Sequence, residues 1–114
     1  MIVFSLATTQ NREKNLESII PNILQQCDLI YVNLIGYTNT PEIVNNKKII
    51  INRFEEVGSE IRFFDYNECE DDTYYFTIDD DILYPTNYSD VMISNMELYN
   101  NENCLLYTSD AADE

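Results

Sequence analysis

Three consecutive aspartates, Asp79, Asp80 and Asp81, are the residues of this 114-residue chain best suited to chemistry. They directly follow the apolar and aromatic segment Tyr74–Ile78. Adjacent carboxylates repel each other, by about 4 kcal/mol for a pair about 4 Å apart at an effective dielectric constant near 20. Two things relieve this repulsion: solvent, as in an acidic turn that ends a strand, or a hard divalent cation. The spacing alone leaves both interpretations open.

A continued strand would give these carboxylates different roles. Side chains alternate along a strand, so Asp79 and Asp81 would share one face and Asp80 would point away from them. The Cα atoms of Asp79 and Asp81 would then lie about 6 to 7 Å apart. That separation is wide for two direct ligands of one ion. We therefore expect one of these carboxylates to bind a metal and the other to bind a hydroxyl group of a sugar.

The composition excludes several other kinds of site. The chain has no histidine, which rules out Ser-His-Asp and Cys-His catalysis and His-ligated zinc. Its three cysteines, Cys27, Cys69 and Cys104, form no CxxC pair, and this favours a reducing cytoplasm over a disulfide framework. A net charge of −15 disfavours nucleic acid as a partner. No apolar run approaches the roughly 18 residues of a transmembrane segment.

The elements that must position the aspartates alternate between strand and helix. Apolar runs predict four strands, and the spacing of apolar residues predicts three helices. The first helix contains Pro21 and is expected to kink there or to split in two. We therefore expect an α/β fold with a mostly parallel, doubly wound sheet and flanking helices. The expected strands are Met1–Ala7, Asp28–Leu34, Ile49–Ile51 and Tyr74–Ile78, and the expected helices are Leu16–Cys27, Glu60–Asn67 and one that begins at Asn87.

Polar groups follow three of these strands and should meet at one edge of the sheet. They are Thr8–Arg12, Asn33–Tyr37 and Asp79–Asp81. In open α/β sheets, ligands bind beyond the carboxyl ends of the strands. The chain has neither a GxGxxG nor a GxxxxGK[ST] motif. Any ligand is therefore held differently than by a dinucleotide fingerprint or a P-loop.

Four segments, in order along the chain, resemble one protein family. The segment Tyr75–Pro85 (YFTIDDDILYP) is similar to the DXD segment of GT-A-fold glycosyltransferases, in the family-2-like group of bacterial sugar transferases. Ser5–Arg12 resembles that group's opening strand and T-x-x-R loop, Asp28–Tyr37 its second strand, and Gly58–Phe64 the segment before the DXD strand. The resemblance covers residues 1 to about 100 and implies a Rossmann-like GT-A fold.

The resemblance implies a nucleotide-diphosphate-sugar donor and a bound Mn²⁺ or Mg²⁺ ion. In it, Asp79 approaches the ribose or base, Asp81 reaches the metal that bridges the two phosphates, and Arg62 meets the diphosphate. The plainer alternatives are a surface ion pair for Arg62 and ordinary turn chemistry for Thr8 and Thr9. The donor-binding residues implied in this way are Thr8, Thr9, Arg12, Asn33, Arg62, Asp79 and Asp80, and the metal ligands are Asp81 and Asp79.

The chain departs from this family after its last predicted helix. The family's acceptor side and general base follow the DXD strand and its helix, and here the sequence stops soon after that helix. We therefore expect an incomplete fold: residues 1–103 form the donor-binding part, and residues 104–114 resemble translated sequencing adapter, with a natural acidic C-terminus as the alternative. Such a cytoplasmic fragment would be inactive alone, and its acceptor (sugar, lipid or protein) is open. The competing interpretation is a small acidic cation-binding or protein-interaction module without catalysis.

Overall fold

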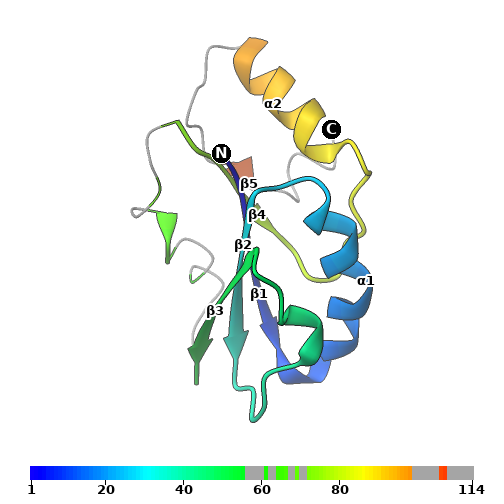
Figure 1. Ribbon diagram of the computed structural model, residues 1–114, viewed down its shortest axis with the longest axis vertical. Helices are drawn as coiled ribbons and strands as arrows, with labels where there is room; N and C mark the ends of the chain where they lie inside the picture. Colours follow the sequence, from blue (N-terminus) through cyan, green and yellow to red (C-terminus); the bar gives the residue numbers. More distant parts are fainter. Residues whose placement is uncertain (56–60, 62–63, 67–68, 70–71, 99–105, 108–114) are drawn as a thin grey trace.

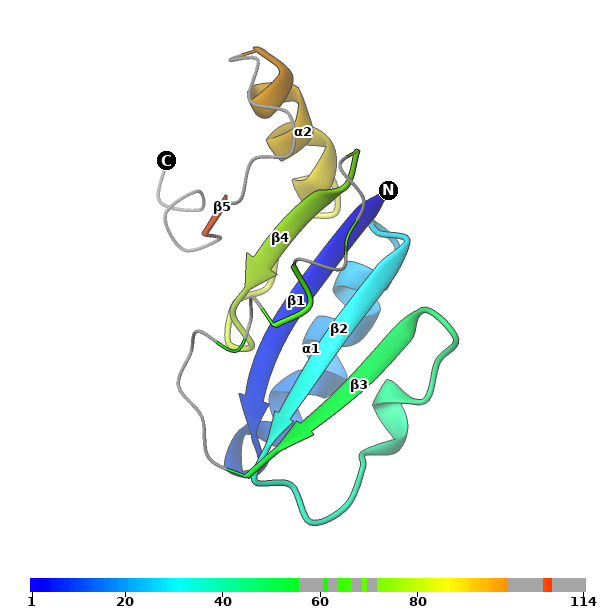
Figure 2. The same ribbon diagram turned by 90° about the vertical axis from the view of Figure 1, so that its left-hand side faces the viewer.

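A parallel β-sheet with α-helices packed on it forms the body of the protein (Figure 1). The computed structural model describes residues 1–55, 61, 64–66, 69, 72–98 and 106–107. Strands β1 (Ile2–Thr9), β2 (Leu29–Ile35), β3 (Ile49–Phe54) and β4 (Tyr74–Ile78) are all parallel and lie in the order β3-β2-β1-β4 (Figure 2). The predicted α/β class and parallel sheet are confirmed.

Strand β1 lies inside the sheet and is buried on both faces along most of its length. It pairs with β2 on one side and with β4 on the other, so that Phe4 lies between Ile30 and Phe76. All three of these side chains are fully buried. A strand enclosed in this way reads as a continuous apolar run, and this is why Met1–Ala7 could be predicted as one.

Both described α-helices pack on the same face of the sheet. Helix α1 (Glu13–Leu24) follows a 3₁₀ turn, η1 (Gln10–Arg12), and helix α2 (Tyr88–Leu98) follows the turn after β4. Pro21 lies inside a single helix, so the alternative of two separate helices is wrong. The Tyr88 ring contacts Phe4 and Phe76 edge-on. The side chains that α1 and α2 contribute to this core are Leu16, Ile19, Ile20, Ile23, Tyr88, Met92 and Met96.

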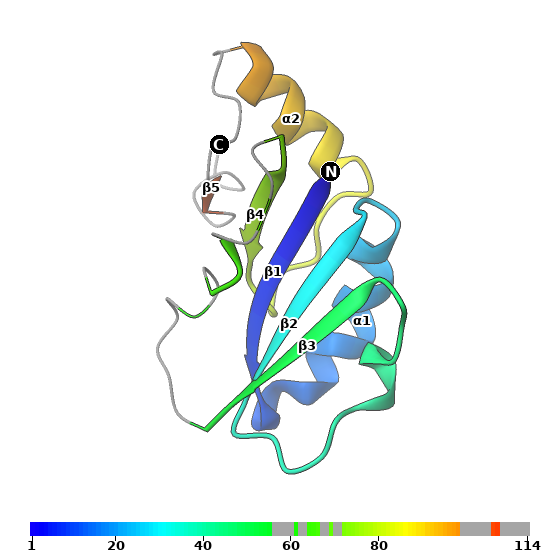
Figure 3. The ribbon, with the colours of Figure 1, turned by 60° about the vertical axis from the view of Figure 1, so that its left-hand side comes forward.

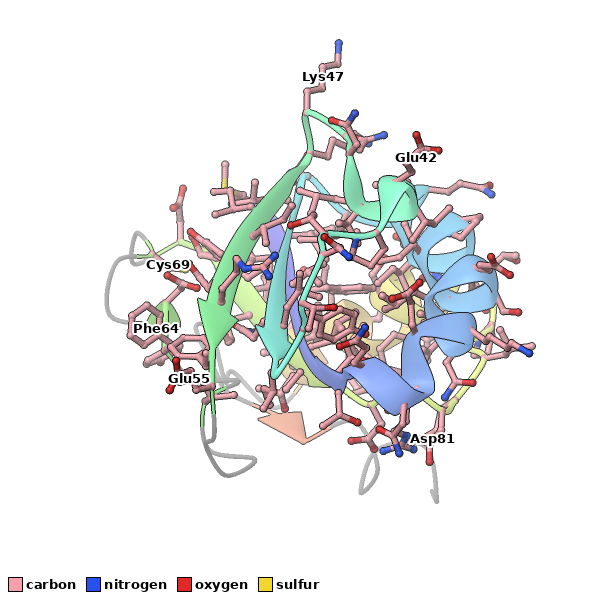
Figure 4. The ribbon with its side chains drawn as sticks, turned by 90° about the horizontal axis from the view of Figure 1, so that it is seen from below. Glu42, Lys47, Glu55, Phe64, Cys69 and Asp81 are labelled. Carbon is pink, nitrogen blue, oxygen red and sulfur yellow. The ribbon has the colours of Figure 1, made fainter. Side chains whose placement is uncertain are left out.

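The second face of the sheet carries a smaller core of Val3, Tyr31 and Tyr75. In Figure 4, Phe64 and Cys69 lie on the side of β3 away from α1. Four of the eight residues of the helix expected over Glu60–Asn67 lie outside the described residues. Phe64, an apolar residue of that expected helix, is 57% exposed. Because both described α-helices share one face, the doubly wound arrangement stays a prediction.

Two connections shape the ends of β2 and β3. Gly36 follows β2 with a φ of +70°, a left-handed conformation that favours glycine. A 3₁₀ turn, η2 (Glu42–Val44), then leads to β3, which runs further than the predicted Ile49–Ile51. A two-residue strand, β5 (Leu106–Tyr107), pairs with β4. It lies within residues 104–114, whose separation from residues 1–103 stays a prediction.

Candidate functional site

The strand order creates a junction between β1 and β4. From β1 the chain moves across the sheet through β2 to β3, and β4 then adds to the opposite side of β1. The carboxyl ends of β1 and β4 therefore lie side by side, and ligands of open α/β sheets bind beyond the carboxyl ends of the strands. The residues that follow these two strands at their carboxyl ends are Gln10–Arg12 and Asp79–Asp81 (Figure 3).

Arg12 joins the two sides of this junction. Its Nη1 lies 3.3 Å from Oδ1 of Asp80, and its Nη2 lies 2.9 Å from Oδ2 of Asp81. The Arg12 side chain is 44% exposed, while Asp80 is 4% and Asp81 55% exposed. Figure 4 places Asp81 beside the start of α1. One guanidinium thus holds a buried and an exposed carboxylate together.

The buried carboxylate of Asp80 is only half satisfied. Its Oδ1 faces Arg12, but its Oδ2 has no hydrogen-bond partner among the described residues. A buried carboxylate oxygen without a partner is costly because it has lost its hydration. This oxygen is therefore a natural ligand for a hydrogen-bond donor or a cation.

The expected alternation of the three aspartates does not hold. Strand β4 ends at Ile78, and Asp80 and Asp81 lie in a turn. Their side chains converge on Arg12 instead of pointing to opposite faces. Asp79 is half-buried. The reason is that residues past the end of a paired strand lose the two-residue period on which the prediction depended.

The segment Asp79–Asp81, called the acidic turn below, is fixed by Tyr84. The Tyr84 hydroxyl accepts a 2.9 Å hydrogen bond from the backbone N–H of Asp79. Helix α1 holds Tyr84 in turn. The Asn22 amide donates to the Tyr84 carbonyl at 2.7 Å and accepts from the Tyr84 N–H at 3.0 Å. This two-point contact imitates backbone pairing. A rigid helix therefore sets where the segment after the aspartates lies.

Four residues further along, just past the end of α1, Gln26 continues the same attachment. Its side-chain amide donates to the carbonyl of Pro85 at 2.8 Å and accepts from the N–H of Ser89 at 2.9 Å. The Ser89 hydroxyl donates to the Gln26 carbonyl. Gln26 is 7% exposed, so these bonds are shielded from water. Together, Asn22 and Gln26 attach α1 to the connection between β4 and α2.

Thr8 contributes a second polar pair behind the junction. It is buried at the end of β1, and its Oγ1 lies 3.2 Å from the hydroxyl oxygen of Tyr37. Burial raises the pKa of the Tyr37 hydroxyl; the Thr8 hydrogen bond opposes this, and the charges of Glu13 and Asp80 add to it. Tyr37 therefore stays a neutral hydroxyl at neutral pH.

Thr9 and its neighbours form the outer rim of the same loop. Thr9 is exposed, and its hydroxyl donates to the side chain of Asn11. The Gln10 amide donates to the Thr38 hydroxyl at 3.1 Å and accepts from the Thr38 N–H at 3.2 Å. These bonds tie the loop after β1 to the loop after β2. Thr9 is accessible at the rim, and Thr8 is not.

Asn33 lies away from the ion pairs that Arg12 makes with Asp80 and Asp81. It is fully buried and pairs with Ala7, which places it on the other face of the sheet from Thr8. Its amide donates to Ser5 and to the carbonyl of Leu6, and its oxygen accepts from Asn52. The structure therefore brings Arg12, Asp80 and Asp81 together and pairs Thr8 with Tyr37, but it places Asn33 apart from them. Arg62 lies outside the described residues.

Three residues that organise the turn, Asn22, Gln26 and Tyr84, were not predicted as part of the site. The available signal was weak: two amides four residues apart border the apolar stripe of α1. Their partners lie about 60 residues further along the chain, as shown by the separation of 62 between Asn22 and Tyr84. A residue pattern within one helix does not show which distant residues its side chains contact.

Comparisons with known proteins gave no match that bears on this site. No model of a known protein family matches the sequence, and no curated protein matches it either. Within the described part of the chain, no group of three or more histidine, cysteine, aspartate or glutamate side chains is arranged to hold a metal ion. None of the described helices has the length and apolar character needed to cross a membrane.

Proposed function

We propose that this chain is the donor-binding part of a GT-A-type glycosyltransferase, which binds a nucleotide-diphosphate sugar together with Mn²⁺ or Mg²⁺. The observation that carries the proposal is the buried Asp80 carboxylate, which has one oxygen without a partner among the described residues and lies at the β1–β4 junction. The similarity of Tyr75–Pro85 to a DXD segment supports the same assignment.

The residues present fit a cation that is shared with a substrate. Mg²⁺ is usually held by one or two carboxylates, with substrate phosphates and water as the remaining ligands. Asp80 and Asp81 offer two carboxylates on one turn. A third protein ligand is not required for such a site. The lack of a three-residue cluster in the described part is therefore compatible with the proposal.

The chain's own residues would divide the work of donor binding. Asp80 and Asp81, which share Arg12, would hold the cation in place of the Asp81 and Asp79 pair that the resemblance implies, and the half-buried Asp79 would face the ribose or base. Arg12 is exposed enough to reach a diphosphate, whose oxygens suit its forked donors. The buried Thr8–Tyr37 pair would form the inner wall. When bound, the cation would take up negative charge that develops on the leaving diphosphate.

Calorimetry with uridine diphosphate and guanosine diphosphate tests this function. We expect one of them to bind in Mn²⁺ and not in EDTA. Asp80→Asn and Asp81→Asn should each weaken that binding by at least about 10-fold, a loss seen even when outer-shell residues of metal sites are changed. Asp90→Asn is the matched control, because Asp90 is an exposed residue in the first turn of α2.

Two results would contradict the proposal. If Mn²⁺ binds but neither nucleotide adds to it, the chain is a cation-binding module. If Asp90→Asn weakens binding as much as Asp80→Asn does, the effect comes from overall charge and not from a site. Thermal melts of every variant show whether it is folded.

A further inference from the structure

We infer that Arg12 occupies the cation site as an internal counter-ion, and that a divalent cation must displace it before the donor diphosphate can use it. This inference rests on the proposed function and adds a regulation of the same site. It predicts that the cation and the nucleotide bind cooperatively, each weakly without the other.

The acidic turn holds more negative charge than Arg12 neutralises. Two carboxylates of this turn, those of Asp80 and Asp81, pair with the one guanidinium of Arg12. The guanidinium already occupies Asp80 Oδ1 and Asp81 Oδ2, while Asp80 Oδ2 stays without a partner. A single positive charge therefore leaves the turn under-compensated. A divalent ion would neutralise it more fully.

A divalent cation and the Arg12 guanidinium cannot share these carboxylates comfortably. Both are positive, and ligation by Asp80 and Asp81 would place them within a few ångströms of each other, where like charges repel strongly. Arg12 is the partner that can leave, because its side chain is 44% exposed and Asp80 is 4% exposed. Cation binding therefore releases the guanidinium towards solvent.

A nucleotide diphosphate gives the displaced Arg12 side chain a new anionic partner. Its oxygens accept bidentate hydrogen bonds from a guanidinium, so Arg12 exchanges one anionic partner for another instead of being left unpaired. The cation is then no longer in competition with Arg12. By linkage, the nucleotide raises the affinity for the cation by the same factor by which the cation raises the affinity for the nucleotide.

Two other basic residues, Arg53 and Lys14, make no ion pair with Asp80 or Asp81. Arg53 donates to the Tyr37 carbonyl and to Thr40, which fixes the loop after β2. Lys14 is exposed in the first turn of α1. Lys14 carries the same charge as Arg12, and no ion pair of the described residues uses it. It therefore serves as a matched control for the field of a nearby cation.

The experiment measures free Mn²⁺ by electron paramagnetic resonance while the full chain is titrated, with and without uridine or guanosine diphosphate. In the unaltered chain we expect a coupling factor between cation and nucleotide within about 5- to 150-fold, the usual range for such linkage. Arg12→Gln should bind Mn²⁺ alone at least about 5-fold more tightly and should lose most of the coupling. Lys14→Gln should leave both quantities close to those of the unaltered chain.

Arg12→Lys keeps the charge but removes the fork. It should restore the weak binding of Mn²⁺ alone, yet recover only part of the coupling, because an ammonium does not bind a diphosphate in a bidentate way. A residue with a merely structural role would weaken both ligands together. Opposite effects of Arg12→Gln on Mn²⁺ alone and on the coupling are therefore the signature of a counter-ion.

Several outcomes would overturn the inference. If Arg12→Gln weakens Mn²⁺ binding, or if Lys14→Gln strengthens it equally, Arg12 is not the competitor, although Mn²⁺-dependent nucleotide binding by the unaltered chain would still support the proposed function. If Arg12→Gln strengthens Mn²⁺ binding but no nucleotide binds, the counter-ion stands and the donor-binding function fails. If no form of the chain binds Mn²⁺, both are wrong.

Discussion

Replacing Asn22 by alanine should detach the segment after the acidic turn from α1. Asn22 is half-buried and makes two hydrogen bonds to the backbone of Tyr84, at 2.7 and 3.0 Å. Each such bond contributes about 1 kcal/mol net, so their loss costs about 2 kcal/mol. Alanine is the better helix former by about 0.6 kcal/mol, which offsets part of this loss. We expect the free energy of unfolding to fall by about 1.5 kcal/mol.

Urea denaturation followed by circular dichroism measures this change, with Ser18→Ala as the control. Ser18 is an exposed residue of the same helix, so its replacement should raise the free energy of unfolding by a few tenths of a kcal/mol through helix propensity alone. The two alanine variants of one helix should thus shift stability in opposite directions. A neutral or stabilising Asn22→Ala would refute the argument that Asn22 holds Tyr84.

Two further predictions concern backbone geometry and pH. Gly36→Ala should lower the free energy of unfolding by about 1 to 2 kcal/mol because of the φ of +70°. Among the described residues, the added Cβ would meet Glu55 O at 3.6 Å, which is ordinary contact. Gly36→Asn should cost less, and equal losses in urea denaturation would contradict this. Burial raises the pKa of the Cys27 thiol to about 11, so the unfolded chain loses this proton first, and the free energy of unfolding should fall as the pH rises from about 9 to about 11. Cys27→Ala should reduce that slope in denaturation curves at the two pH values, and an unchanged slope would exclude the thiol as its cause.

The sheet was largely predictable because its strands are apolar runs. Tyr74–Ile78 was predicted with the bounds that β4 has, and Met1–Ala7 and Asp28–Leu34 each end within two residues of the strands observed. Strand β3 was predicted too short, because its polar half contains Asn52. That half is held by pairing with β2, including a hydrogen bond from Asn52 to Asn33. Tertiary contacts of this kind do not appear in a hydropathy pattern.

The site was predictable in its place but not in its arrangement. The carboxyl ends of parallel strands were expected to gather Thr8, Arg12 and the aspartates, and the structure brings Arg12, Asp80 and Asp81 into contact. The direction of each carboxylate was not predictable, because it depends on where β4 ends and on a turn held by Tyr84. Those features come from side chains that lie far apart in the sequence.

The central position of β1 has a consequence for folding while the protein is being synthesised on the ribosome. At about 5 to 20 residues per second, roughly 1 to 4 s separate the synthesis of β3 from that of β4. During this interval one edge of β1 has no neighbouring strand, which is a hazard for pairing with another chain. Residues 1–55 also lack the charge that keeps copies apart, since five basic residues balance five acidic ones (Glu13, Glu17, Asp28, Glu42 and Glu55). The net charge of −15 accumulates only with the later residues, so the chain gains its electrostatic protection at about the time when β4 closes the open edge.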